Sequence, residues 1–182
     1  RFAYPALLGG LVLLVLVLIP GIGQIRGGAR RWISLGLFAF EPSELMKPLF
    51  VLYLARSLSG KQEKMHDFFF GVLPHLVMMC VPILLLMLEP DFGASAVITV
   101  VTLAMLFTAG ASLFHLGLLG AAVVPPAVLL VWHSPYRLER VTAFLDPWRD
   151  PLGNGFQLVQ SFLAFGSGGV LGTGLGNGKQ KL

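Results

Sequence analysis

Charged residues are scarce in this 182-residue chain: Asp, Glu, Lys and Arg together make up 12% of it, about half of the share that soluble domains carry. Hydrophobic residues make up 55%, and the mean hydropathy is +0.80. This balance excludes an ordinary soluble domain and predicts an integral membrane protein. The chain has a single cysteine, Cys80, which rules out a disulfide framework within it.

Several chemical signatures are also missing. The glycine-rich stretch 166–178 follows no predicted strand and lacks a G-K-[ST] ending, so it is not a nucleotide phosphate loop. The carboxylates are scattered and the histidines are isolated, so no metal-ligand cluster is visible in the sequence; the need for a divalent metal ion stays open. There is no initiator methionine and no signal peptide, and we expect an internal piece of a longer membrane protein.

Five apolar stretches predict an all-α fold, a polytopic bundle of transmembrane helices that forms a single membrane domain over residues 1–182. Each stretch is close to the length that crosses about 30 Å of hydrocarbon. We place the spans at residues 4–22, 42–58, 68–88, 92–109 and 116–132. Residues 24–41 are expected to form a loop, and residues 133–182 a long loop outside the membrane.

Two ionisable residues lie inside the second span, where a charge is costly unless it is paired or faces a cavity. Glu44 and Lys47 are three positions apart and share one helix face, so we expect an ion pair that faces a polar cavity. Exchanging the two charges should be better tolerated than removing one, which would strand the other. The alternative is a pair that only anchors the helix near the interface. His75, in the third span, is expected to be a satisfied histidine bonded to a neighbouring helix.

The loop after the first span is rich in arginine. Arg30 and Arg31 follow one another there, and a guanidinium presents forked donors that suit anionic groups. We therefore expect one of the two to face the mouth of the same cavity.

The tail, residues 144–182, combines turn signals with large apolar side chains. Two Asp-Pro pairs at 146–147 and 150–151 favour turns, and their aspartates are expected to cap these turns rather than act as bases. Residues 156–165 are expected to form a short amphipathic helix that docks on the outer face of the bundle. A flexible linker is the alternative. The polar face of this helix would carry Gln157, Gln160 and Ser161.

Four motifs in register resemble the SEDS family, which comprises FtsW, RodA and SpoVE. They are residues 28–36 (GARRWISLG), 42–47 (PSELMK), 89–93 (EPDFG) and the tail from 146 to 182. The ending at 174–182 (GLGNGKQKL) is more similar to the FtsW branch than to the RodA branch.

The resemblance implies a bacterial peptidoglycan glycosyltransferase of the inner (cytoplasmic) membrane, with ten spans in the whole protein. Such proteins polymerise lipid II outside that membrane with a class B penicillin-binding protein and other division or elongation proteins, and no nucleic acid is involved. The chain would cover spans three to seven and most of a large extracellular loop. The family's proposed catalytic aspartate lies in an H-T-D-F motif beyond Leu182, so this piece should be inactive alone.

The orientation implied by the resemblance conflicts with the distribution of basic residues. With alternating spans, the side that carries the tail holds eight lysines and arginines against four on the other side, which favours a cytoplasmic tail. The family topology places the tail on the outer, periplasmic side, and we give it more weight.

The resemblance also suggests roles for the cavity candidates. The reaction leaves undecaprenyl pyrophosphate, whose charge a cationic cluster or a metal would stabilise, and a carboxylate would activate the acceptor hydroxyl. The substrate-binding candidates are Arg30, Arg31, Glu44, Lys47, Gln157, Gln160 and Ser161. Two other functions stay open: a lipid II flippase, whose polar path would begin at Glu44–Lys47 and His75, and a non-catalytic scaffold for a cell-wall synthase.

Overall fold

The computed structural model describes residues 2–26, 29–34, 36, 38–174 and 176–179. Among the motif positions, Gly28, Leu35, Leu175 and residues 180–182 lie outside the described residues. The chain divides into two compact units, Arg1–Leu119 and Gly120–Leu182, and each is described by itself.

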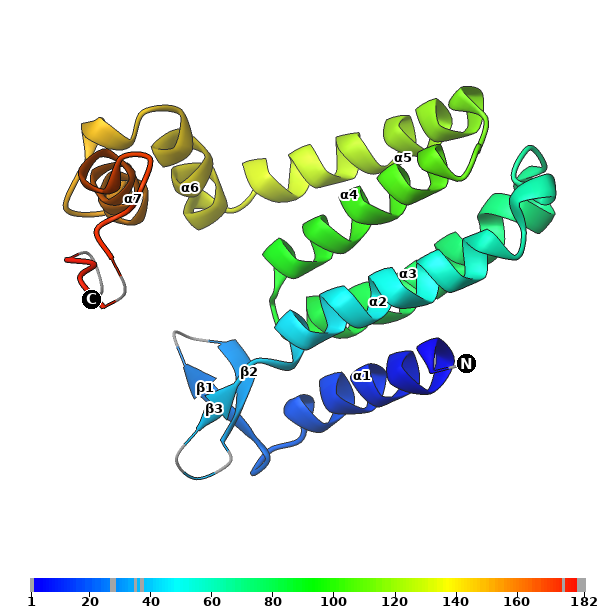
Figure 1. The fold of residues 1–182 in the computed structure, drawn as a ribbon, viewed down its shortest axis with the longest axis horizontal. Coiled ribbons are helices and arrows are strands. Elements are labelled where there is room, and N and C mark those ends of the chain that lie inside the picture. Colours follow the sequence, from blue (N-terminus) through cyan, green and yellow to red (C-terminus); the bar gives the residue numbers. More distant parts are fainter. Residues whose placement is uncertain (1, 27–28, 35, 37, 175, 180–182) are drawn as a thin grey trace. The chain divides into compact units, whose positions relative to one another are not determined.

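The first unit is built around four helices that pack beside one another (Figure 1). They are α1 (Ala3–Leu18), α2 (Pro42–Ser59), α3 (Leu73–Leu88) and α4 (Phe92–Thr108). A short 3-10 turn, η1 (Gln62–Lys64), and a π-helical turn, η2 (Phe68–Val72), lead into α3. The core between the helices consists of fully buried apolar side chains, among them Leu14, Met46, Phe50, Leu54, Leu86 and Ile98.

A small antiparallel sheet follows α1, so the all-α prediction is wrong for residues 23–40. Its strands are β1 (Gly23–Arg26), β2 (Ala29–Ser34) and β3 (Ala39–Phe40), in the order β1-β2-β3. The sequence predicts a loop here, because arginines and glycines obscure the alternation of apolar and polar residues that is typical of a strand. Ile25, Trp32 and Ile33 are residue types that favour strands, and Ile33 is buried.

The first helix is shorter than its predicted span because of a proline. Pro20 disfavours a helical conformation at the residue before it, and Ile19 is extended, with φ −72° and ψ 125°. The chain therefore leaves the helix at Leu18, four residues before the predicted end at Ile22. Pro42, by contrast, begins α2 as predicted, because the first helical turn needs no N–H from it.

Two helical stretches are long and apolar enough to cross a membrane, residues Phe68–Leu88 and α5 (Leu113–Trp132), while α1 and α4 are shorter apolar helices. The predicted spans at 68–88, 92–109 and 116–132 lie on these helices to within a few residues.

The second unit holds the larger part of α5, from Gly120 onward, and three further elements. These are α6 (Pro135–Leu145), the 3-10 turn η3 (Pro147–Arg149) and α7 (Phe156–Gly168). The loop predicted for residues 133–182 is helical at residues 135–145, where Pro135 stands at the first helical position, at which proline is favoured. Helix α7 contains the predicted segment 156–165 and packs against η3, with Val159 buried.

Candidate functional site

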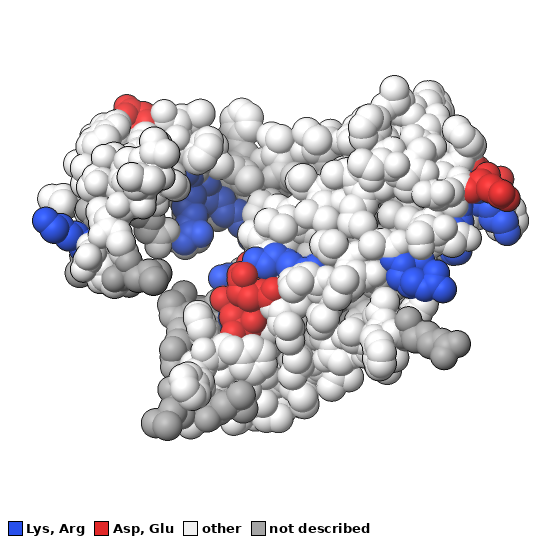
Figure 2. Space-filling model, in the orientation of Figure 1, with Lys and Arg blue, Asp and Glu red and all other residues white. Residues whose placement is uncertain are grey.

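Acidic and basic side chains meet at one end of the first unit, where β2, the start of α2 and the α3–α4 turn come together. We call this group the polar end. Figure 2 shows acidic residues beside basic ones on this face. The group consists of Arg31, Glu41, Glu44, Lys47, Glu89 and Asp91.

The predicted ion pair is present. Lys47 Nζ lies 2.8 Å from Glu44 Oε1, across one turn of α2. The side chain of Glu44 is 65% exposed and that of Lys47 is 26% exposed. Removing either partner would therefore not strand a deeply buried charge. Burial thus gives little reason to expect that exchanging the two charges is better tolerated than removing one of them. Whether the pair faces a substrate cavity stays a prediction.

Both arginines of β2 tie the sheet to other elements. Arg31 Nε donates to the backbone oxygen of Glu89 at 3.1 Å, and Arg31 Nη2 donates to the backbone oxygen of Pro90. Arg30 Nη1 donates to the backbone oxygen of Leu18 at 3.3 Å. A guanidinium carries more N–H groups than these bonds use, so contact with a pyrophosphate stays a prediction for both residues.

Glu89 is the most unusual residue of the polar end. Its side chain is fully buried, and neither carboxyl oxygen has a hydrogen-bond partner among the described residues. Burial and the nearby charges of Asp91 and Glu41 raise the pKa of Glu89 to about 8, although Arg31 acts in the opposite direction. The folded protein therefore keeps this carboxyl group protonated at neutral pH. The sequence marked Glu89 only as part of a turn motif, because its burial depends on packing.

The two other carboxylates next to Glu89 have distinct environments. Burial, and then the charge of Asp91, raises the pKa of Glu41. Asp91 caps α4, since its Oδ1 accepts a hydrogen bond from Ala94 N at 3.1 Å, which satisfies an N–H group that the helix itself leaves open. Among the residues that the structure describes, no group of three or more His, Cys, Asp or Glu side chains is arranged to hold a metal ion.

His75 is a satisfied core histidine, as expected. Its Nε2 lies 2.9 Å from Ser57 Oγ on α2, and its Nδ1 lies 2.7 Å from the backbone oxygen of Gly71. With both ring nitrogens engaged, His75 holds α3 to α2 and offers little to a polar path through the bundle.

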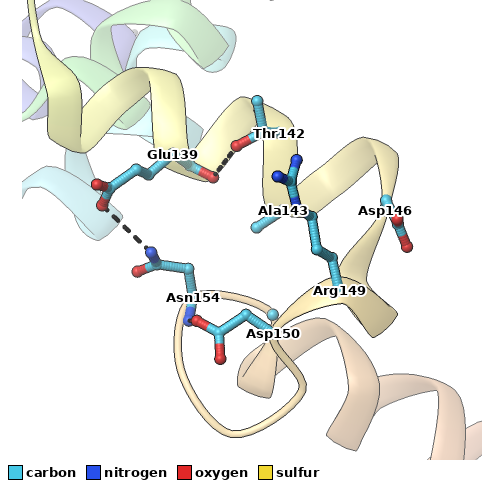
Figure 3. Close-up of a pocket in the computed structure, with 8 residues that line it drawn as sticks. Glu139, Thr142, Ala143, Asp146, Arg149, Asp150 and Asn154 are labelled. Atoms are coloured by element: carbon cyan, nitrogen blue, oxygen red, sulfur yellow. Dashed lines mark hydrogen bonds between the residues drawn. The ribbon is translucent and has the colours of Figure 1, made fainter.

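The second unit has a small polar cavity of about 250 Å³ between α6 and the loop before α7 (Figure 3). Asp150 shapes this loop: its carboxylate accepts hydrogen bonds from Gly153 N at 3.1 Å and Asn154 N at 3.0 Å. Asn154 Nδ2 in turn donates to Glu139 Oε2 at 3.2 Å. The capping role expected for Asp150 is therefore confirmed.

The three candidates on α7 do not line this cavity. Gln157 and Ser161 are exposed and Gln160 is half-buried. Ser161 Oγ donates to the backbone oxygen of Gln157 at 2.8 Å. Their proposed contact with a sugar or a peptide stays a prediction.

Comparison with known proteins shows the family of the chain. The profile of the cell cycle protein family that comprises FtsW, RodA and SpoVE matches residues 1–182. The chain belongs to this family. Members of this family are membrane proteins, and the apolar helices of the chain fit a mostly helical membrane protein. The family match confirms the resemblance drawn from the four motifs.

Relatives and solved structures agree with this assignment. The probable peptidoglycan glycosyltransferase FtsW of Geobacter sulfurreducens is 48% identical over 182 residues, which is 100% of this chain and 49% of that protein. Stage V sporulation protein E of Bacillus subtilis is 45% identical over 169 residues, or 93% of this chain and 46% of that protein.

A chain in a solved peptidoglycan synthase complex has a TM-score of 0.66 and 37% identity, covering 93% of this chain and 49% of that chain. The chain thus spans about half the length of the curated relatives that it matches.

Proposed function

We propose that the protein that contains this chain is a peptidoglycan glycosyltransferase that polymerises lipid II. The polar end is the observation that carries the proposal. It gathers two cations and several carboxylates at one end of an apolar helical unit, in a chain whose relative from Geobacter sulfurreducens is named a probable peptidoglycan glycosyltransferase.

The proposed chemistry assigns different roles to these charges. Lys47, with Arg30 or Arg31, would stabilise the negative charge that develops on the departing pyrophosphate. Glu44 would hold Lys47 in place through their ion pair. Gln157, Gln160 and Ser161 would hydrogen-bond the sugar or the peptide. We assign all of these residues to binding and orienting substrate rather than to activating the acceptor hydroxyl.

The proposed setting is the bacterial inner membrane. We propose that the chain contributes five spans and a periplasmic tail to a single membrane domain, and that the whole protein works with a class B penicillin-binding protein. The similarity to a chain in a peptidoglycan synthase complex supports such a partner.

Reconstitution of the full-length protein in vesicles with lipid II, and without any other synthase, tests the proposal. Glycan polymer would support it. Movement of lipid II across the bilayer without polymer would favour the flippase, and neither activity would favour a scaffold. A Lys47→Met variant in the same vesicles is the matched comparison. Because Lys47 is proposed to bind the departing pyrophosphate, the variant should form less polymer than the wild type.

A further inference from the structure

The Glu44–Lys47 pair occupies the first turns of α2, so its position depends on what holds the start of that helix. We propose that Arg31, through its bonds to the backbone oxygens of Glu89 and Pro90, forms a clamp that sets the start of α2 and thereby positions Glu44 and Lys47, and that the charge state of the buried Glu89 side chain controls this clamp. The activity test of this inference rests on the proposed function, whereas its hydrogen-exchange test does not.

The first link of the clamp joins β2 to the α3–α4 turn. Arg31 reaches two successive backbone oxygens, those of Glu89 and Pro90, in a segment 58 residues away along the chain. A forked guanidinium can hold two such acceptors at once, whereas an ammonium group is a compact point charge. The contact therefore fixes the position of the turn relative to β2.

The second link carries this position to α2 through the sheet. β2 pairs with β3 in the register Ile33↔Phe40 and Ser34↔Ala39. Only Glu41 separates β3 from Pro42, the first residue of α2. A shift of β2 would therefore move the first turn of α2 and the ion pair on it.

The third link is the charge state of Glu89. The charged groups that act on its carboxyl are Asp91 on the same turn, Glu41 at the start of α2 and Arg31 on β2. A neutral Glu89 leaves Arg31 bonded to the backbone oxygens. An ionised Glu89 would repel the carboxylates of Asp91, on the same turn, and of Glu41, next to the start of α2, and this repulsion would push the turn and the start of α2 apart. The clamp should therefore hold at neutral pH and loosen as the pH rises through about 8.

Glu89→Gln tests the charge state, because glutamine keeps the shape of the side chain and cannot ionise. In the full-length protein, we expect wild-type polymer formation to fall at least threefold between pH 7 and pH 9, and the fall to be much smaller for Glu89→Gln. Glu63→Gln, which neutralises an exposed glutamate of η1, should keep the wild-type profile. Equal profiles for wild type and Glu89→Gln would overturn the role of Glu89.

Arg31→Ala tests the tether with a readout that does not depend on activity. We expect amide hydrogen exchange over residues 39–47 to become at least tenfold faster at neutral pH, while Arg56→Ala, an exposed arginine at the other end of α2, leaves it unchanged. Arg31→Lys should give a smaller increase and is measured instead if Arg31→Ala does not fold. Unchanged exchange in both Arg31 variants would overturn the clamp. A wild-type protein that makes no polymer would refute the proposed function and leave this exchange test valid.

Discussion

Replacing Glu89 by glutamine should make the protein more stable at neutral pH, although it removes a native side chain. The wild-type carboxyl group is fully buried and has no hydrogen-bond partner among the described residues. It holds a proton in the folded state with a pKa of about 8, against 4.5 for an ordinary glutamate. The unfolded chain releases that proton at neutral pH, and this release favours unfolding.

The size of the effect follows from the two pKa values. Between pH 4.5 and pH 8 the folded state binds more protons at Glu89 than the unfolded state does, so stability falls as the pH rises through this window. Each pH unit costs about 1.4 kcal/mol. At pH 7, roughly 2.5 units above the unfolded value, the loss amounts to at most about 3.5 kcal/mol, and glutamine avoids it.

Thermal or denaturant unfolding of the full-length protein from pH 4.5 to pH 9 measures this pH-dependent loss of stability. We expect the difference between Glu89→Gln and wild type to grow across the window and then to level off above pH 8. Glu63→Gln should run parallel to wild type. A Glu89→Gln protein that is less stable than wild type at pH 7, or a difference that does not change with pH, would refute the reasoning.

Three further predictions concern packing and helix docking. A methyl group on Gly155 would lie 2.1 Å from the backbone oxygen of Pro147, so Gly155→Ala should lower the free energy of unfolding by about 1–3 kcal/mol. The control, Gly166→Ala in α7, meets nothing within 4 Å and should be neutral or stabilising by about 0.5–1 kcal/mol. Equal losses of stability in the two variants would contradict the clash. Ser57→Ala should cost about 1–3 kcal/mol because it leaves a ring nitrogen of the buried His75 without its partner, and an unchanged unfolding midpoint would argue against that bond. Amide exchange across residues 156–165 in the full-length protein should be slow, because docking through its apolar side chains would protect α7; exchange as fast as that of residues 59–67 would support the linker alternative.

The sequence predicted those parts of the fold that depend on hydrophobic length and on local chemistry. Apolar runs located the helices, Pro42 marked the start of α2, and the spacing of Glu44 and Lys47 predicted their ion pair. The tail helix was predicted from its amphipathic pattern, although α7 continues three residues beyond Phe165.

The parts that were missed depend on contacts between distant segments. The strands around Arg31 gain their pairing from one another, and glycine and arginine hide their alternation in the sequence. The partner of Arg31 lies 58 residues away, at a distance that no local pattern spans. Glu89 looked like an ordinary turn residue at the end of an apolar run, and its full burial arises only when the chain is folded.

The most direct test of the account compares polymer formation with stability in variants of the ion pair. The exposure of Glu44 makes the pair worth less than about 1 kcal/mol to folding, so Glu44→Gln and Lys47→Met should unfold almost as wild type does. Glycan formation from lipid II by the full-length protein should nevertheless fall at least tenfold in each variant. Wild-type polymer yields from both single variants would contradict the assignment of the polar end as the substrate site.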